Sequence, residues 1–157
     1  MLPNFVCPAC KSNLIYISDS RLYCAVDDFY FHQQDGIWRF LLPDRSSYYK
    51  AFIEDYEFIR NQEKRGSTEP EYYRSLPYRD LLKQKEHGWS IRAQSFNGFI
   101  QQVLKPFEKE HPFPLTILDW GSGNCWLSNR LSVRGHAAAA MDILVNNMDG
   151  LSGLLAR

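Results

Sequence analysis

The spacing of apolar residues changes along the chain, and each spacing predicts a different kind of structure. In the first part, short apolar runs at residues 14–17, 22–23, 29–31 and 37–42 alternate with turn-forming residues, which predicts short β-strands. In the middle of the chain, apolar side chains recur at helical spacing. From Leu115 onward the two patterns alternate, and the sequence therefore predicts an α/β unit there.

The segment 115–143 carries the most specific pattern in the chain. An apolar run ends at Asp119 and is followed at once by Gly121-Ser122-Gly123, a helix-like segment and a second apolar run that ends at Asp142. This order predicts a strand, a tight turn, a helix and a second strand, which is the opening unit of a nucleotide-type α/β sheet. Glycines let the backbone approach a ligand, the helix offers free N–H groups, and an acid at the second strand end can bind two ribose hydroxyls.

The same segment limits the kind of nucleotide. Trp126 stands where a dinucleotide fold needs its third glycine, and no Gly-Lys-Ser/Thr follows the glycines as in a phosphate loop. The remaining D-x-G-x-G pattern, with its later acid, resembles motif I and the following acidic position of class I S-adenosylmethionine-dependent methyltransferases. The resemblance implies S-adenosyl-L-methionine as the cofactor, with Asp119, Gly121 and Gly123 shaping the methionine end of its pocket and Asp142 binding the ribose.

Two features of this segment depart from a complete methyltransferase pattern. Cys125 stands where the family often has a third small residue, and a class I sheet has seven strands, whereas this sequence predicts two strands and a following helix at about residues 146–156. We therefore expect an incomplete Rossmann-like sheet, in the N-terminal part of a longer protein that could be inactive alone. Because the acceptor side lies in the later strands of this family, the catalytic residues are unknown. The alternative is a degenerate α/β turn whose glycines serve packing alone.

The first 42 residues predict a separate small β unit of zinc-ribbon type. Cys7 and Cys10 form a C-x-x-C pair, and Cys24-Ala25-Val26-Asp27 follows as a second, partial pair. Zinc prefers four thiolate or imidazole ligands in a closed structural site, and a metal can replace a core too small to stand alone. Cys7, Cys10 and Cys24 are the expected ligands, with Asp27 as the fourth by its spacing and His32 as a second candidate. The metal could also have been lost, and Cys125 is not expected to be a ligand.

This segment has a resemblance of its own, to small ribbon proteins related to the eukaryotic methyltransferase-activating subunit. In that family the ribbon binds and stabilises a catalytic subunit, and some bacterial members likewise carry Asp in place of the fourth Cys. Two prolines usual in the family are replaced here by His32 and Trp38. The resemblance implies a fusion of ribbon and methyltransferase, and it rests on Cys7-Pro8-Ala9-Cys10-Lys11, Leu14, Leu22-Tyr23-Cys24-Ala25-Val26-Asp27, Tyr30-Phe31 and Asp35-Gly36-Ile37.

Between the two units the sequence predicts a helical connector and linker over residues 43–88. Asp44 is expected to cap a helix, and residues 63–77, with two prolines and Gly66, are the best candidate for a linker. A second amphipathic helix is expected over residues 89–107, interrupted near Pro106. The apolar residues of the two helices are expected to pack: Tyr49, Phe52, Ile53, Tyr56 and Ile59 in the first, and Trp89, Ala93, Phe96, Ile100, Val103 and Phe107 in the second.

Composition and charge narrow the function further. The chain has 157 residues, of which 45% are hydrophobic, and its formal net charge is zero, so no global basic field indicates nucleic acid. No apolar stretch is long enough to span a membrane, and no secretory signal is visible. Four cysteines without such a signal suggest thiols or metal ligands in a reducing compartment, which predicts a cytoplasmic protein.

Three hypotheses of function follow. The leading one is an S-adenosylmethionine-dependent methyltransferase with domains 1–42 (ribbon), 43–88 (connector) and 89–157 (methyltransferase), acting on an acceptor that is RNA, a protein or a small molecule. The second is a non-enzymatic module whose ribbon docks or activates a protein partner. The third is an RNA-binding ribbon, which neutral charge disfavours because phosphate contacts need clustered Lys and Arg.

Overall fold

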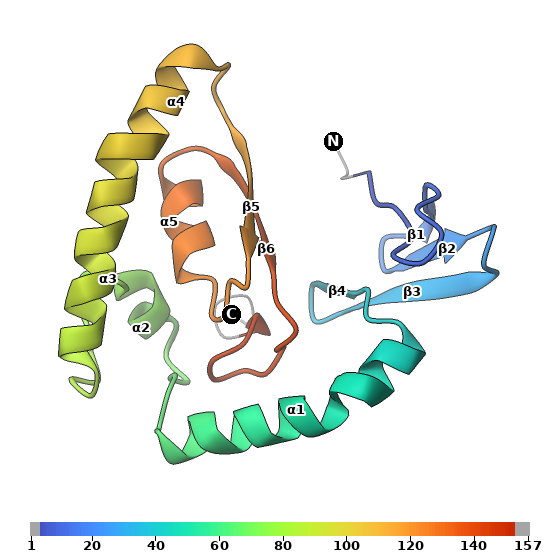
Figure 1. The fold of residues 1–157 in the computed structure, drawn as a ribbon, viewed down its shortest axis with the longest axis horizontal. Coiled ribbons are helices and arrows are strands. Elements are labelled where there is room, and N and C mark those ends of the chain that lie inside the picture. The colour runs from blue at the N-terminus through green and yellow to red at the C-terminus, as the bar shows by residue number, and fades with distance from the viewer. Residues whose placement is uncertain (1–3, 153–157) are drawn as a thin grey trace. The chain divides into compact units, whose positions relative to one another are not determined.

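The structure is a computed structural model that describes residues 4–152. The chain divides into two compact units, Met1–Glu63 and Lys64–Arg157. The first contains a four-stranded antiparallel sheet and a long helix, and the second contains the other helices and a parallel pair of strands (Figure 1). The mixed α/β class with an N-terminal β unit is confirmed. The stretch 43–88, predicted as one connector, is shared between the two units.

The sheet of the first unit is a meander in which each strand pairs with the next, in the order β1-β2-β3-β4. Alternating side chains build its core, because Leu22 and Cys24 on one strand and Phe31 on the next are buried, with Leu22 directly opposite Phe31. Leu14 and Cys7 complete this buried cluster. The strands are β1 (Ile15–Ser18), β2 (Arg21–Cys24), β3 (Phe29–Gln34) and β4 (Ile37–Arg39).

The loop between β3 and β4 is a tight turn of two residues, Asp35 and Gly36. Asp35 and Gly36 both have positive φ, 53° and 77°, and Gln34 pairs with Ile37 across them. This is the two-residue turn that fits the twist of paired strands, and Asp-Gly is a preferred pair for it. Aromatic rings of Phe5, Tyr16, Trp38 and Phe40 then pack together beside the core, with centroids 5.0 to 6.4 Å apart.

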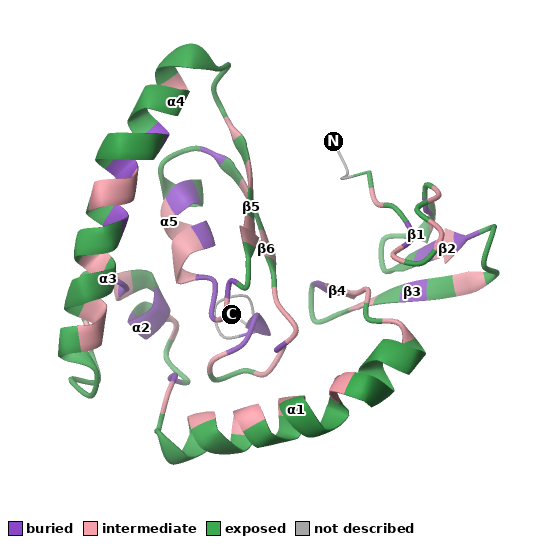
Figure 2. Cartoon of the chain, in the orientation of Figure 1, coloured by how far each residue is buried: buried purple, intermediate pink, exposed green. Residues whose placement is uncertain are grey.

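The helix α1 (Pro43–Gln62) begins two residues earlier than the capping signal suggests. Leu42 is the N-cap, Pro43 takes the first helical position, and Asp44 lies in the first turn, so the prediction of Asp44 as the cap was wrong. The expected packing of its apolar side is also not observed, because no residue of α1 is buried (Figure 2). Phe52, for example, is 54% exposed. Helical spacing shows which side chains share a face, but it supplies no surface to cover that face.

The predicted linker is a packed part of the second unit. It contains the short helix α2 (Pro70–Ser75), whose Tyr72 and Tyr73 form a buried cluster with Leu76. The Tyr73 hydroxyl accepts the Ser67 N–H at 2.9 Å and lies against the carbonyl oxygens of Ser67 and Met148. The prolines and small residues correctly predict turns. The segment is nevertheless packed, because Tyr72 and Tyr73 are buried in the core of the second unit.

Three consecutive helical segments form one rod in the second unit (Figure 1): α3 (Glu86–Phe99), the π-helical turn η1 (Ile100–Leu104) and α4 (Lys105–Glu110). Pro106 has no N–H with which to bond the residue 102 carbonyl, and a wide turn just before it accommodates this loss. The wide turn moves Leu104 into the core beside Phe96 and Ile100. Val103 and Phe107, both predicted to pack, are therefore about half exposed.

The strands of the second unit are parallel neighbours, as the sequence predicts. β5 (Thr116–Trp120) and β6 (Ala137–Met141) pair in register from Thr116 opposite Ala137, and α5 (Trp126–Val133) connects them. One face of this pair packs through Ile117 and Ala138 on the core of Phe96, Ile100, Leu104 and Leu131. Trp126 contacts Phe96 and Trp89 edge to face, which confirms Trp89 as a packing residue.

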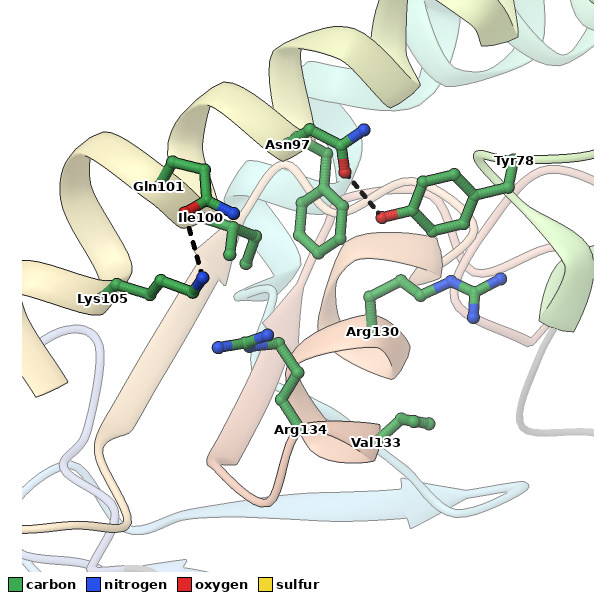
Figure 3. Close-up of a pocket in the computed structure, with 9 residues that line it drawn as sticks. Tyr78, Asn97, Ile100, Gln101, Lys105, Arg130, Val133 and Arg134 are labelled. Carbon is green, nitrogen blue, oxygen red and sulfur yellow. Dashed lines mark hydrogen bonds between the residues drawn. The ribbon is translucent and has the colours of Figure 1, made fainter.

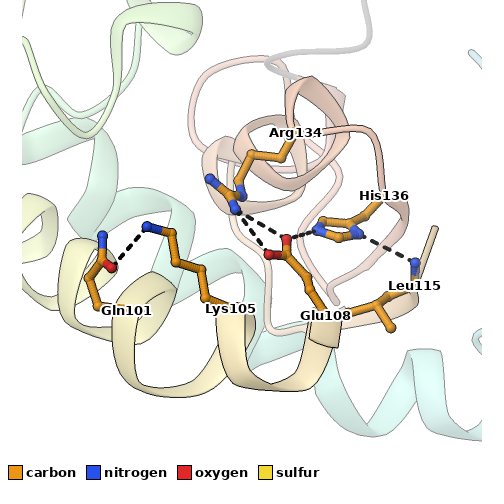
Figure 4. Close-up of polar contacts among 6 residues, drawn as sticks. All are labelled: Gln101, Lys105, Glu108, Leu115, Arg134 and His136. Carbon is orange, nitrogen blue, oxygen red and sulfur yellow. Dashed lines mark hydrogen bonds and ion pairs between the residues drawn. The ribbon is translucent and has the colours of Figure 1, made fainter. Parts of the chain in front are cut away.

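A polar clamp fixes the start of the two strands to α4 (Figure 4). His136 is buried, its Nδ1 accepts the Leu115 N–H at 3.3 Å, and its Nε2 lies 2.9 Å from Glu108 Oε1. Since Nδ1 is an acceptor, the ring proton is assigned to Nε2, which donates to Glu108. Arg134 also donates to Glu108, at 3.1 Å. The clamp therefore joins α4, α5 and both strand starts.

The other face of β5 and β6 is open. Trp120 is 80% exposed, Leu118 is 56% exposed and Met141 is 41% exposed. Residues 4–152 form no complete Rossmann sheet, since only two parallel strands are present in them. The helix expected at 146–156 does not begin at residue 146, because residues 147–151 form turns and a bend. Residue 152 is helical, and residues 153–156 lie outside the described range. Within residues 4–152, no helix has both the length and the apolar character needed to cross a membrane.

Candidate functional site

The four predicted metal ligands converge in the first unit. One ligand atom each from Cys7, Cys10, Cys24 and Asp27 lies within 4.8 Å of the others, which is close enough to hold a metal ion. Asp27 Oδ2 is 3.0 Å from Cys7 Sγ and 3.3 Å from Cys24 Sγ, and Cys10 Sγ is 3.4 Å from Cys24 Sγ. The edges of a zinc tetrahedron with bonds near 2.3 Å measure about 3.5–3.8 Å, so the closest pairs would move apart and the widest pair, separated by up to 4.8 Å, would move together to hold the ion.

The backbone explains why Asp27 can stand in for a cysteine. In the first turn the residue after the second ligand, Lys11, has φ 64°, and in the second turn the residue after Asp27, Asp28, has φ 49°. Few residues other than glycine adopt this left-handed conformation, so its occurrence at the same place shows that the two turns share one geometry. The Lys11 N–H donates to the Cys7 carbonyl, and the Asp27 N–H lies 3.4 Å from Cys24 Sγ. Asp27 thus occupies the position that Cys10 has in the first turn.

The thiols of this cluster differ in their ease of ionisation. Burial raises the pKa of Cys7 to about 11, with the neighbouring Asp27 carboxylate adding to the effect. The Ser12 hydroxyl, 3.4 Å from Cys24 Sγ, lowers the pKa of Cys24. Hydrogen bonds from the thiols, Cys10 first, lower the pKa of Asp27. Protons that bridge these groups are the ones that a bound cation would replace.

His32 and Cys125, the other residues that could bind a metal, lie outside this cluster. His32 is exposed on β3, where it pairs with Arg21 and Arg39, and it does not belong to the group of converging ligand atoms. Of the two candidates for the fourth metal ligand, the structure therefore places Asp27, and not His32, beside the three cysteines. Cys125 is buried in the second unit and is not a member of the group.

The glycine turn closes tightly on β6. Gly121 and Gly123 have φ of 77° and 53°, and the N–H groups of Gly121 and Ser122 both donate to the Met141 carbonyl, at 2.8 and 3.1 Å. A Cβ added at Gly121 would meet no atom within 4 Å, so the backbone there faces open space. The turn therefore requires glycine for its conformation, and it leaves room for another molecule beside residue 121.

The two predicted acids have different surroundings. Asp119 accepts both the Ser128 hydroxyl at 2.7 Å and the Ser128 N–H at 3.2 Å through one oxygen. It thereby joins the end of β5 to the first turn of α5, where a negative charge is favourable. Asp142 accepts the Gly123 N–H at 2.7 Å and the Leu144 N–H at 2.8 Å, one on each oxygen. Asp142 thus accepts a hydrogen bond from the glycine turn itself, whereas Asp119 contacts α5 through Ser128.

Two polar residues of this region, Ser128 and Asn124, were not predicted from the sequence. Ser128 was detectable in principle, because it lies in the first turn of α5 and a hydroxyl there can meet an acid on the preceding strand. Asn124 is buried, with its amide 3.4 Å from Asp149 and its oxygen 3.4 Å from the Trp126 N–H, and no sequence signal marked it. Burial raises the pKa of Cys125 to about 11, so this thiol stays protonated and is a poor nucleophile.

Comparison with protein families, with curated proteins and with solved structures finds no match for this chain.

Proposed function

We propose that the chain binds S-adenosylmethionine at the glycine turn and functions as part of a class I methyltransferase, with a zinc-stabilised ribbon in its first unit. The observation that carries the proposal is the meeting of two neighbouring parallel strand ends, since Asp142 after β6 accepts the Gly123 N–H of the turn after β5 at 2.7 Å. Ligands of open α/β sheets bind at the carboxyl ends of the strands, which is where these residues lie.

The residues present fit the parts of this cofactor. Each oxygen of Asp142 accepts one backbone N–H, and a carboxylate has about four lone-pair positions, so both oxygens can also accept a ribose hydroxyl. The open space at Gly121 suits close approach of the amino-acid part of the cofactor to the backbone. Asp119 is a positioning residue in this proposal, because it holds α5 against β5 through Ser128.

The division of labour follows from the cofactor. S-adenosylmethionine supplies an electrophilic methyl group, so the protein mainly has to hold the cofactor and the acceptor in line. We assign the holding of the cofactor to the turn at residues 121–123 and to Asp142. We assign no general base among residues 4–152.

The ribbon has a structural role in the proposal. Three thiols and one carboxylate with their ligand atoms within 4.8 Å of one another make a set of four ligands, the number typical of structural zinc. The binding energy of such a site stabilises the fold directly, and the small core of this unit would gain from it.

Calorimetric titration of the 157-residue chain with S-adenosylmethionine tests the cofactor proposal. Asp142→Asn should weaken binding by about tenfold to hundredfold, because one charge-assisted bond to the ribose contributes about 1.5–3 kcal/mol. Asp80→Asn is the matched control, since Asp80 also accepts two backbone N–H groups, from Leu82 and Lys85, in the same unit. Cys24→Ser in the first unit should leave the affinity unchanged. A parent chain that does not bind, or an equal loss in Asp142→Asn and Asp80→Asn, would overturn the proposal.

A non-enzymatic interaction module is the second candidate. It is favoured by the absence of any buried residue in α1, together with the exposed aromatic rings of Tyr48, Phe52 and Phe58 on that helix. Apolar side chains exposed along one element are typical of protein-binding surfaces. Under this alternative Phe52→Ser abolishes capture of a protein partner, while Asp142→Asn has no effect on it.

A further inference from the structure

A groove in the second unit lies between the helical rod and α5 (Figure 3). Its volume is about 330 Å³, which is within the range of small-molecule sites. Phe96, Ile100 and Val133 supply its apolar lining, and Lys105, Arg130 and Arg134 supply positive charge. The groove is built from residues other than the glycine turn and Asp142, so it is separate from the cofactor site proposed above.

The positive charge of this groove is only partly compensated. Lys105 Nζ donates to the neutral amide of Gln101 at 3.0 Å, and the Arg130 guanidinium donates to the carbonyl oxygens of Leu76 and Arg74, both at 2.6 Å. Among residues 4–152, neither Lys105 nor Arg130 has a carboxylate within ion-pair distance, and no acid lines the groove. Only Arg134 is paired, with Glu108 (Figure 4). Two of the three cations therefore lack a counter-charge.

The side chains around the groove are arranged as two ends (Figure 3). At one end Lys105 and Arg134 extend toward the same space from facing helices. At the other end the Tyr78 hydroxyl donates to Asn97 at 2.9 Å, and the Arg130 guanidinium lies 5.2 Å from the centre of the Tyr78 ring. A ligand that fits both ends carries an anionic group at the first and a planar or apolar group toward the second.

We propose that this groove binds a phosphate ester of nucleotide size, with its phosphate between Lys105 and Arg134. Lys105 supplies the uncompensated charge, and Arg134, whose Nη2 is held by Glu108, donates through its other guanidinium nitrogens. Phosphate offers several acceptor oxygens to two cations at once, and arginine and lysine are its usual partners. The groove is larger than a bare phosphate needs, so the attached group extends along it toward Tyr78 and Arg130. The same chemistry is present in a free nucleotide and in one unit of an RNA strand, and the two sources are separated by experiment.

The test is titration of the 157-residue chain with uridine monophosphate and, in a second arm, with a ten-residue uridine RNA, both at low salt. Lys105→Gln should weaken binding of the recognised probe by about tenfold. Lys105 is exposed, and among residues 4–152 its side chain has one hydrogen bond, to Gln101, so the variant should fold normally. Lys109→Gln is the matched control, because Lys109 is an exposed lysine of α4 that does not line the groove.

Each outcome decides the proposal. Saturable binding of the mononucleotide that only Lys105→Gln weakens supports it with a free nucleotide as ligand, and the same result confined to the RNA supports it with a strand as ligand. Asp142→Asn should leave both affinities unchanged, which separates this groove from the proposed cofactor site. Equal losses in Lys105→Gln and Lys109→Gln would reveal general charge attraction and overturn the proposal, as would a lack of saturable binding by both probes.

Discussion

Replacement of Gly66 by alanine tests whether the segment predicted as a linker is a packed part of the second unit. Gly66 has φ 86° and is buried against the loop that follows β6. A Cβ at this position would lie 1.9 Å from the Met148 carbonyl oxygen and 2.4 Å from its carbon. Both atoms belong to the backbone, so rotation of a side chain cannot relieve the overlap.

The expected cost has two parts. A left-handed backbone costs a residue with a Cβ about 1–2 kcal/mol. The Met148 carbonyl would also have to retreat by about 1 Å to reach 3.0 Å, the shortest contact that real Cβ atoms show, and overpacking of this kind costs about 1–3 kcal/mol. Because Tyr73 lies against the same carbonyl, the retreat would disturb that contact as well. We therefore expect Gly66→Ala to lower the free energy of unfolding by about 2–5 kcal/mol.

Urea unfolding followed by tryptophan fluorescence measures this change. A Trp38→Phe background leaves Trp89, Trp120 and Trp126, so the signal reports on the second unit. Gly98→Ala is the control, since Gly98 lies in α3 and an added Cβ would meet no atom within 4 Å. It should raise stability by about 0.5–1 kcal/mol. If Gly66→Ala unfolds within about 0.5 kcal/mol of the parent, the packing of this segment is misassigned.

Three further predictions concern the ribbon, the clamp and β5. Asp27→Ala should weaken zinc binding, measured by competition with a chromophoric chelator, by more than the roughly tenfold cost of an outer hydrogen bond. Asp28→Asn, which removes the carboxylate that accepts the Tyr23 hydroxyl and keeps a residue type suited to the left-handed backbone at φ 49°, should leave the zinc affinity unchanged. Equal affinities of Asp27→Ala and the parent would exclude Asp27 as a ligand. The Arg134 guanidinium lowers the pKa of Glu108 below its ordinary 4.5, so the ionised form stabilises the fold above that pH and the contribution is lost as pH falls. Glu108→Gln should accordingly flatten the acid limb of stability against pH, and an unchanged slope would contradict the clamp. Asp119→Ala should destabilise the second unit by about 2–4 kcal/mol in urea unfolding, because two hydrogen bonds from Ser128 are lost, and Ser128→Ala should cost less because its N–H bond remains.

The sequence predicted the features whose causes are local. The strands of the ribbon follow from turn residues such as Asp35-Gly36, and the convergence of Cys7, Cys10 and Cys24 follows from paired turns on adjacent strands. The order of β5, α5 and β6 follows from the glycine turn and the two apolar runs. In each case a few neighbouring residues determine the backbone, so their pattern is sufficient.

The predictions that were wrong concern features that depend on contacts between residues far apart in the sequence. The burial of Gly66, Tyr73 and their neighbours depends on Tyr73 meeting Met148, which is 75 residues away. The register of the helical rod depends on how Pro106 is accommodated, and a π-helical turn places Leu104 in the core where helical spacing selects Val103. The helix α1 has apolar residues at helical spacing, but nothing within residues 4–152 covers them, so they stay exposed.

The open face of β5 and β6 connects stability with the proposed function. Parallel strands are normally covered on both faces, yet Trp120 and Leu118 are largely exposed here. Covering an aromatic side chain of this size removes roughly 150–250 Å² from water, which contributes about 4–6 kcal/mol. The glycine turn and Asp142 lie at the carboxyl ends of these same two strands, and their hydrogen bonds are to each other and to the adjacent backbone. Any layer that covers Trp120 would therefore stabilise the strands that position both groups, so burial of this face and affinity for the cofactor should rise together.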